Sequence, residues 1–231
     1  MEIQKKYHIS IGSNIGNRIK NIQETIDLIH SRIASLLSIS SIYETESIGF
    51  EGDDFFNICA SFNSFKSPHF IMNEFLEIEK LLGRVRSEEK KYTSRIIDID
   101  ILLVDDMIIN SEELTIPHKE MCNRRFVLDP LIDINPNIIH PVNKMSIKEI
   151  LNSLESKQKI QNKDIILQNP AHSVKINNYS YIAIEGNIGS GKTSLSKLIS
   201  SDFNTKLMLE RFIDNPFLAK FYKNPEDYAF K

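Results

Sequence analysis

The chain has 231 residues, 41% hydrophobic and 26% charged, which is enough apolar material for one or two folded domains. Its formal net charge of −3 argues against a general nucleic-acid binder, because such proteins present a basic face. The two cysteines lack metal-ligand spacing, which argues against a zinc site and a disulfide framework. The sequence shows no apolar signal segment and no stretch long enough to span a membrane, so we expect a cytoplasmic protein.

The first part of the chain alternates strand-like and helix-like segments. A short strand is predicted at 8–11, and isoleucines then recur at helical spacing over 19–33. Strand-like runs follow at 38–45 and 55–62. The segment 46–54 between them contains two glycines and two aspartates, so we expect an exposed loop.

A second helix is predicted after Ser67 and Pro68, which suit the N-cap and the first helical position. Gly83 suits its C-terminal end, because a glycine tolerates the left-handed conformation found there. The charged stretch 84–94 should then be a loop, and 96–104 a strand.

After two prolines, the segment 146–154 is helix-like. The resulting β-α-β-β-α-β order over 5–155 predicts an α/β fold, specifically an α+β sandwich of the ferredoxin-like kind. Residues 156–179, rich in Lys, Gln, Asn and Ser, are predicted to be a linker. Residues 180–231 then form a second unit that opens with a new strand.

Asp98 and Asp100 stand two apart in the otherwise apolar strand, so both carboxylates lie on one face of it. Adjacent carboxylates repel each other unless a cation lies between them, and oxygen ligands on a rigid strand suit Mg²⁺. The alternative is a solvated strand face with ordinary surface acids, and the pair alone does not separate the two interpretations.

Arginines surround this pair in the sequence. Arg84, Arg86 and Arg95 precede it, and Arg124 and Arg125 follow it. A lone arginine often only neutralises a surface acid, but the guanidinium group is also well shaped for polyphosphate oxygens. Several of them beside paired carboxylates favour phosphoryl transfer, in which metals bridge phosphates and cations stabilise the developing charge.

Residues 7–150 also carry an ordered set of short motifs. In chain order they are Ile11-Gly12-Ser13-Asn14, Ser41-Ile42-Tyr43-Glu44-Thr45, Phe56-Asn57, Gly83-Arg84-Val85-Arg86, Arg95-Ile96-Ile97-Asp98-Ile99-Asp100-Ile101, Pro117-His118 and Asn123-Arg124-Arg125-Phe126. Each motif alone is weak. Their order and spacing resemble 6-hydroxymethyl-7,8-dihydropterin pyrophosphokinases of the folate pathway.

The resemblance implies transfer of pyrophosphate from ATP, the co-substrate, to the hydroxymethyl group of the pterin, with release of AMP. It implies two Mg²⁺ ions held by Asp98 and Asp100, and a clamp on the triphosphate by Arg84 and Arg95, which complete the catalytic set. The ATP-binding residues that it implies are Glu79, Arg84, Arg86, Tyr92, Arg95, His118 and Arg124. The expected partners are the small-molecule pterin and ATP, with no nucleic acid and no membrane.

For the pterin, the resemblance implies stacking by Phe55 and Phe126 and hydrogen bonding by the Asn57 amide. Backbone groups near Thr45 and Gly49 would complete the recognition. Either phenylalanine, considered alone, would more often be a core residue.

Two loops depart from the family pattern. A proline commonly follows the Thr45 position closely in the family, whereas here Glu46 and Ser47 follow it. The loop before Arg95 often carries Trp, Gly and Pro, whereas here it reads Lys-Lys-Tyr-Thr-Ser over 90–94. We expect both loops to act as lids, because a phosphoryl transfer is usually shielded from water.

The second unit carries the phosphate-loop pattern Gly-x-x-x-x-Gly-Lys-Thr between a predicted strand at 181–185 and a predicted helix at 194–201. Backbone N–H groups would cradle phosphate, Lys192 would reach the terminal phosphates and Thr193 would bind Mg²⁺. The loop residues in this pattern are Gly186, Gly189, Gly191, Lys192 and Thr193.

The same stretch resembles the N-terminal part of deoxynucleoside kinases, which implies that Glu210 acts as the base on the sugar hydroxyl. Such kinases need more sequence than follows here, so we expect a truncated unit or a fragment of a longer fusion. Two alternatives remain for this unit, namely deoxynucleoside kinase activity and a non-catalytic nucleotide-binding or assembly role.

Overall fold

The computed structural model describes residues 3–47, 52–84, 94–156, 158–171, 181–187, 189–202, 206–209 and 223. Contacts along the chain divide it into two compact units, Met1–Val174 and Lys175–Lys231. The first unit is a mixed α/β fold built on an antiparallel sheet, so the predicted class is confirmed at that level. Across the described part of the chain, no helix has the length and apolar content to cross a membrane.

A six-stranded sheet forms the centre of the first unit. Its strands run in the order β5 (Asp98–Val104), β1 (Lys5–Ser13), β4 (Phe55–Ser64), β3 (Ile42–Thr45) and β8 (Ile160–Lys163), and β2 (Leu36–Ile39) also pairs with β4. Every pairing in it is antiparallel. A separate hairpin joins β6 (Ile109–Asn110) to β7 (Thr115–Ile116).

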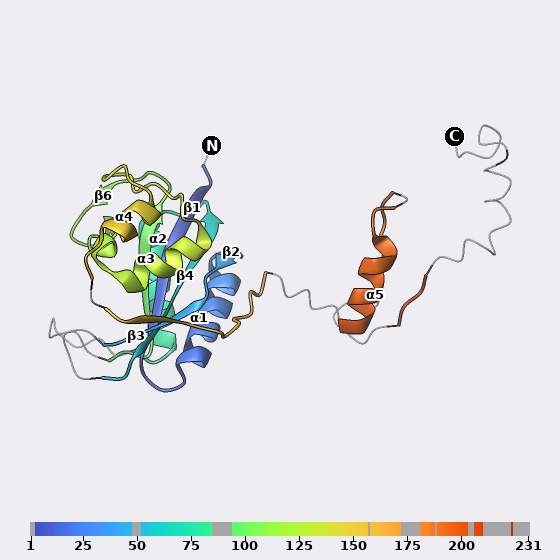
Figure 1. The fold of residues 1–231 in the computed structure, drawn as a ribbon, viewed down its shortest axis with the longest axis horizontal. Coiled ribbons are helices and arrows are strands. Elements are labelled where there is room, and N and C mark those ends of the chain that lie inside the picture. Colours follow the sequence, from blue (N-terminus) through green and yellow to red (C-terminus); the bar gives the residue numbers. More distant parts are fainter. Residues whose placement is uncertain are drawn as a thin grey trace. The chain divides into compact units, whose positions relative to one another are not determined.

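Helices cover both faces of this sheet. Side chains alternate between the two faces, and apolar side chains on each face pack against helices. One apolar core joins the sheet to α1 (Arg18–Arg32) and α2 (Pro68–Leu81). A second core joins it to the short helix η1 (Met121–Asn123), α3 (Arg125–Ile134) and α4 (Ile147–Ser153). Figure 1 shows α3 lying across the strands.

The ends of α2 follow the sequence signals that predicted them. The Ser67 hydroxyl accepts a hydrogen bond from the Phe70 backbone N–H at 3.2 Å, and Pro68 occupies the first helical position. Gly83 follows the helix with φ +91°, a conformation that side chains other than glycine rarely adopt. Helix α3 is not among the predicted elements, and it contains Pro130, a residue type that normally breaks a helix.

The linker prediction needs a correction at its start, because residues 160–169 belong to the first unit. Strand β8 pairs with β3, and Ile165 and Leu167 pack against the first apolar core. Gln168 exchanges two hydrogen bonds with Gln23, each of 2.9 Å. The polar composition of β8 hides it in the sequence, since an edge strand is held by backbone hydrogen bonds and tolerates polar side chains.

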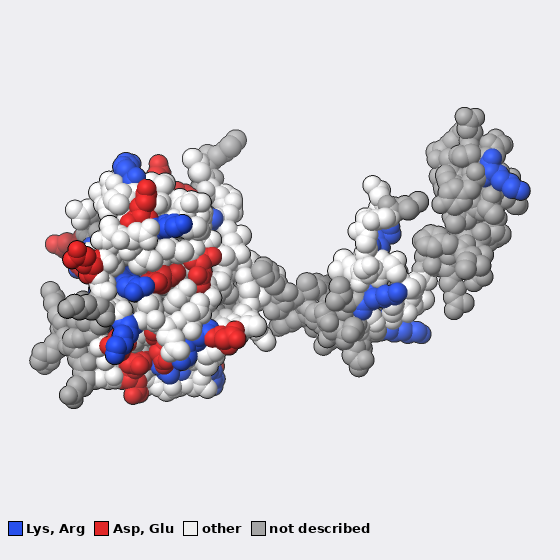
Figure 2. All heavy atoms as spheres, viewed as in Figure 1, with Lys and Arg blue, Asp and Glu red and all other residues white. Residues whose placement is uncertain are grey.

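Charges of both signs are interspersed over the visible face of the first unit (Figure 2). This distribution agrees with the small net charge of the chain, −3. Any anionic ligand must therefore be held by a local group of residues, and such a group lies in the cavity described next.

Candidate active site

A cavity of about 320 Å³ opens on the sheet face that also carries η1 and α3. Strand register explains its floor. Gly12 of β1 pairs with Asn57 of β4 on one side and with Asp98 of β5 on the other, and side chains of paired residues share a face. Because the sheet repeats every two residues, Asp100 reaches the same face. Four strands therefore supply the floor, and the η1–α3 segment supplies the opposite wall.

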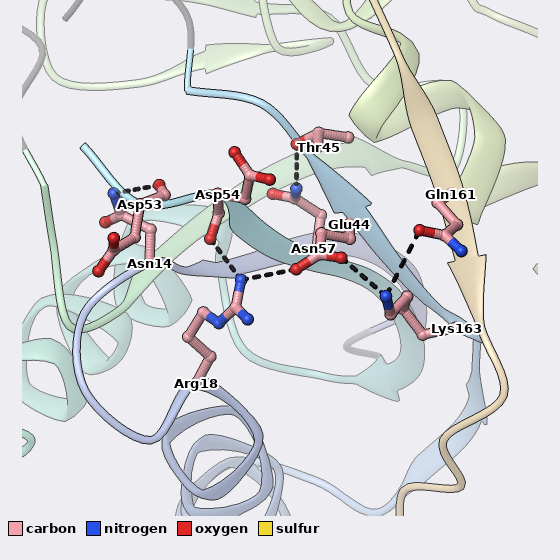
Figure 3. A network of polar contacts seen from close by, with 9 residues as sticks. All are labelled: Asn14, Arg18, Glu44, Thr45, Asp53, Asp54, Asn57, Gln161 and Lys163. Atoms are coloured by element: carbon pink, nitrogen blue, oxygen red, sulfur yellow. Dashed lines mark hydrogen bonds and ion pairs between the residues drawn. The ribbon is translucent and has the colours of Figure 1, made fainter. Parts of the chain in front are cut away.

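One end of the cavity presents flat and amide surfaces. Phe55 and Phe126 line it from the sheet and from α3, respectively. The buried Asn57 amide donates to the Thr45 hydroxyl at 2.9 Å (Figure 3). Gly12 leaves the space that this amide occupies, since a Cβ atom there would lie 3.0 Å from Asn57 Oδ1. Such an end suits a flat heterocycle with hydrogen-bonding edges.

The other end is ionic and centres on Asp98. Arg84 donates to Asp98 Oδ1 at 2.5 Å and to Glu79 Oε1 at 2.5 Å, and Arg95 donates to Asp98 Oδ2. Glu79 is almost fully buried and also accepts the Ile99 backbone N–H at 2.9 Å. Burial, and then the nearby Asp98 carboxylate, raise the pKa of Asp100. The charged form of Asp100 therefore lacks adequate compensation here.

These carboxylates fit a hard divalent cation. Two oxygen-bearing side chains from one rigid strand face the cavity, and a cation beside them would stabilise the charged form of Asp100, which burial and then the Asp98 carboxylate disfavour. Among the described residues, no group of three or more His, Cys, Asp or Glu side chains could hold a metal by itself. Mg²⁺ matches this donor set, because it commonly uses one or two carboxylates and takes its other ligands from phosphate and water.

Asn14 ties the start of β5 to the loop after β1. Its Oδ1 accepts the Arg95 backbone N–H at 2.7 Å, and its backbone N–H donates to the Arg95 carbonyl at 3.1 Å. Its Nδ2 donates to the Ser94 hydroxyl at 3.1 Å and to the Asp53 carbonyl at 3.0 Å (Figure 3). Asn14 thus fixes the backbone that carries Arg95.

A second polar network lies on the opposite face of β3. The Glu44 carboxylate accepts from Arg18 at 3.0 Å and from Lys163 of β8 at 2.8 Å (Figure 3). Arg18 also donates to the Asp54 carbonyl at 2.7 Å and stacks 3.7 Å from the centre of the Phe56 ring. The network joins α1, β3, β8 and the start of β4.

Most of the predicted site residues within the described part of the chain lie at this cavity. The residues that line it are Thr45, Phe55, Asn57, Arg95, Asp98, Asp100, Arg124 and Phe126. Arg84 contacts the site through Asp98, and Glu79 contacts it through Arg84; neither of them lines the cavity. Gly49, Arg86 and Tyr92 lie outside the described residues. The functional roles of all these residues stay predictions.

His118 is not among the lining residues. Its backbone N–H donates to the Leu102 carbonyl at 2.9 Å, and its Nδ1 accepts the Glu120 backbone N–H at 3.3 Å. Burial lowers its pKa to about 4, so the imidazole is neutral at pH 7. A neutral ring can bind phosphate only through an N–H donor and adds no positive charge.

Sequence reasoning did not assign six further residues that line the cavity. They are Ser10, Gly12, Glu46, Glu120, Asn123 and Gln158. Ser10 and Gly12 could have been found, because they alternate along β1 and Gly12 belongs to a motif already noted. Gln158 carried no comparable signal, since it lies in the predicted linker.

The second unit contains one described helix, α5 (Lys192–Asp202), directly after the glycine-rich loop. Gly186, Gly189 and Gly191 have φ values of 157°, 79° and 86°. Lys192 folds back over the loop and donates to the Gly186 carbonyl at 2.5 Å and to the Asn187 carbonyl at 2.7 Å. Thr193 follows it in the first turn of α5.

The strand predicted before this loop is not formed, because residues 181–187 have no regular secondary structure. A strand needs a neighbour to pair its backbone groups, and the described part of this unit offers none. Glu210 lies outside the described residues.

Known proteins match the two parts of the chain separately. Residues 8–136 match the family described as 7,8-dihydro-6-hydroxymethylpterin-pyrophosphokinase, and residues 182–231 match the family described as deoxynucleoside kinase. The pyrophosphokinase of Aquifex aeolicus is 34% identical over 143 residues, which are 62% of this chain and 88% of that protein. The pyrophosphokinase of Bacillus subtilis is 36% identical, over 55% of this chain and 76% of that protein.

Longer relatives match over a smaller share of their length. The folic acid synthesis protein fol1 of Pneumocystis carinii is 40% identical over 141 residues, which are 61% of this chain but only 19% of that protein. Among solved structures, a Plasmodium falciparum HPPK-DHPS has the same fold with a TM-score of 0.55 at 16% identity, covering 66% of this chain and 46% of that one.

Proposed function

The chain belongs to the 7,8-dihydro-6-hydroxymethylpterin-pyrophosphokinase family, and we propose that its first unit transfers pyrophosphate from ATP to 6-hydroxymethyl-7,8-dihydropterin. The products would be the pterin diphosphate and AMP, in folate biosynthesis. One observation carries this proposal. A single cavity places an aromatic and amide surface beside paired carboxylates and arginines, as a reaction between a flat heterocycle and a polyphosphate requires.

At the heterocycle end, Phe55 and Phe126 would hold the pterin between their rings. The Asn57 amide offers hydrogen-bonding groups to the edge of the ring, and its bond to Thr45 fixes its orientation. Binding in this place would leave the hydroxymethyl group of the pterin directed toward the carboxylate end. The backbone near Gly49 is proposed to complete the recognition.

At the phosphate end, Asp98 and Asp100 would hold Mg²⁺, with two ions as the family resemblance implies. Bound there, Mg²⁺ would neutralise phosphate charge and help to align the reacting groups. Arg84 and Arg95 now neutralise Asp98. When ATP binds, these guanidiniums would turn to the triphosphate and stabilise the charge that develops during transfer. Arg124 lines the same cavity and would add a third cation.

The test is AMP formation by the full chain from ATP and 6-hydroxymethyl-7,8-dihydropterin. AMP should appear only when both the pterin and Mg²⁺ are present, and the Asp98→Ala, Asp100→Ala double variant should lose at least 100-fold in rate. Circular dichroism of the variant controls for folding. A folded double variant with full turnover would overturn the assignment.

We propose finer features of the same chain on this basis. The first unit would follow the ferredoxin-like arrangement, and it would extend past the predicted residue 155 to residue 169 or beyond, because β8 and the residues after it join the first unit. The second unit would begin near residue 180, with its glycine-rich loop acting as a phosphate-binding loop. The cytoplasmic location expected from composition stays a prediction.

A second candidate activity belongs to the second unit. Its match to the deoxynucleoside kinase family and the loop folded around Lys192 favour phosphate binding there. ADP release that depends on a deoxynucleoside, and that is lost in Lys192→Ala, would support kinase activity. Nucleotide binding without ADP release would instead support a non-catalytic role.

A further inference from the structure

Gln158 lines the cavity although it lies beyond residue 136, where the family match ends. It stands two residues before β8, the edge strand that pairs with β3. The family region alone therefore does not form the complete cavity wall. A segment that follows it in the chain closes one side.

Strand register explains why Gln158 faces the cavity. Thr45 of β3 pairs with Ile160 of β8, so these two side chains share a face of the sheet. Gln158 is two residues from Ile160 and lies on the same face when the backbone is extended. Thr45 and Gln158 both line the cavity, as this register requires.

The Gln158 side chain has an unused donor. Its Nε2 atom is buried, and within the described structure no acceptor lies in hydrogen-bonding distance of it. A buried N–H group without a partner is costly, and most such groups in folded proteins have one. Because Gln158 lines the cavity, a turn of its side chain would bring this unpartnered donor to an acceptor on a bound ligand.

The strand that follows Gln158, β8, is held to β3 by backbone pairing and by a side-chain contact. Four backbone pairs join β8 to β3, from Ile42 with Lys163 to Thr45 with Ile160. On the far face, the Lys163 ammonium donates to Glu44 at 2.8 Å (Figure 3). Glu44 is also bound by Arg18, which anchors β8 through β3 to α1.

We propose that Gln158 is a further pterin-recognition residue, whose Nε2 donates to an acceptor on the heterocycle, a ring carbonyl oxygen or a ring nitrogen. This inference rests on the proposed function of the first unit. Asn57 of β4 and Gln158, in the segment before β8, would then hold the heterocycle by hydrogen bonds from two different parts of the chain. The phosphate end of the cavity is not involved, so ATP affinity should not depend on Gln158.

The test uses Gln158→Met in the full chain, since methionine keeps the length of the side chain and removes the amide. The matched control is Gln161→Met. Gln161 is exposed and lies on the face of β8 that points away from the cavity, where it pairs with Glu44 of β3. Titration calorimetry measures the Kd of 6-hydroxymethyl-7,8-dihydropterin with Mg²⁺ and a non-hydrolysable ATP analogue present. A second titration measures the Kd of the analogue alone.

We expect Gln158→Met to weaken pterin binding about tenfold, the usual effect of one lost hydrogen bond in a binding site. The Kd of the ATP analogue should stay within about twofold, and Tm should not fall, because the variant removes a buried donor that lacks a partner. Gln161→Met should bind pterin as the natural chain does. Gln158→Glu, which replaces the donor by an acceptor, should also bind pterin weakly and serves if the Met variant does not fold.

Unchanged pterin binding in a folded Gln158→Met or Gln158→Glu would overturn this inference and leave the proposed function intact. Failure of the natural chain itself to bind the pterin would instead overturn the proposed function. A rise in Tm without any change in pterin Kd would show that Gln158 is only a packing residue, and would also contradict the proposal.

Discussion

At the scale of single residues, Gly12 shows how a missing side chain shapes the cavity. A Cβ atom at this position would lie 3.0 Å from Asn57 Oδ1, which is tighter than nine in ten contacts of real Cβ atoms. The Asn57 amide would have to move, and its 2.9 Å hydrogen bond to Thr45 would be strained or lost. The glycine is needed here for space rather than for a left-handed backbone.

We therefore expect Gly12→Ala to weaken pterin binding about tenfold, because it displaces the Asn57 amide and so costs about one hydrogen bond. Titration calorimetry with the pterin measures the change. In an Asn57→Ala background the same substitution should have little further effect, since coupled residues are not additive. Equal effects in both backgrounds would contradict this explanation.

The sequence allowed the ionic end of the cavity to be predicted better than its walls. Asp98 and Asp100 are two apart on an apolar strand, so spacing alone placed them on one face. Asn57 and Phe126 could be placed only through the family resemblance. Gln158 could not be placed at all, because its position depends on how β8 pairs with β3, a long-range register that local patterns do not encode.

At the scale of secondary structure elements, local sequence signals predicted the ends of a helix correctly where residues close in the sequence determine those ends. The start and end of α2 follow from Ser67, Pro68 and Gly83, which act within a few residues. Strand β8 has no such local cause. It exists because β3 offers an edge and because Glu44 offers an acceptor to Lys163.

Two lysines near this edge provide a test of what holds β8. Lys163 pairs with Glu44 at 2.8 Å, with side chains 28% and 21% exposed, whereas Lys159 pairs with Glu46 at 3.3 Å, with side chains 85% and 56% exposed. We expect Lys163→Met to lower the free energy of unfolding by about 1 kcal/mol, and Lys159→Met to change it by less than about 0.3 kcal/mol.

Urea denaturation measures these two changes, and hydrogen exchange of the amides at 160–163 shows whether β8 itself loosens. Faster exchange should be found in the Lys163 variant alone. Equal losses of stability in the two variants would mean that the free energy of unfolding depends on the net charge of the chain and not on the Lys163–Glu44 pair.

The same pair predicts a pH dependence. The hydrogen bond from Lys163 is the largest cause that lowers the pKa of Glu44 below its ordinary value of 4.5, and Arg18 adds to it. A carboxyl with a lowered pKa stabilises the fold above its unfolded-state pKa, and this stabilisation is lost as the pH falls through the folded-state pKa. The stability difference between the natural chain and Lys163→Met should therefore be full at pH 7 and should shrink below about pH 4.5. Urea titrations at several pH values check it, and a constant difference down to pH 3 would contradict it.

At the scale of the whole molecule, the chain joins two units with separate family matches. Among the described residues, those that line the cavity of the first unit all lie between Ser10 and Gln158. The glycine-rich loop of the second unit makes its described hydrogen bonds within itself and with α5. The described residues of each site thus belong to its own unit.

Because the described residues of each site come from one unit, we expect that each site can be inactivated without loss of the other. Lys192→Ala should remove the ammonium that now binds the Gly186 and Asn187 carbonyls, and with it most phosphate affinity of the second unit. AMP formation from ATP and the pterin should stay within about twofold of the natural chain, because no residue of that cavity is altered. Conversely, the Asp98→Ala, Asp100→Ala variant should lose AMP formation and keep nucleotide binding at Lys192.

Calorimetry with an ATP analogue and an AMP assay on both variants separate the two sites. A large loss of AMP formation in Lys192→Ala would show that the second unit contributes to the first, and would require a coupling that the separate construction of the two sites does not explain.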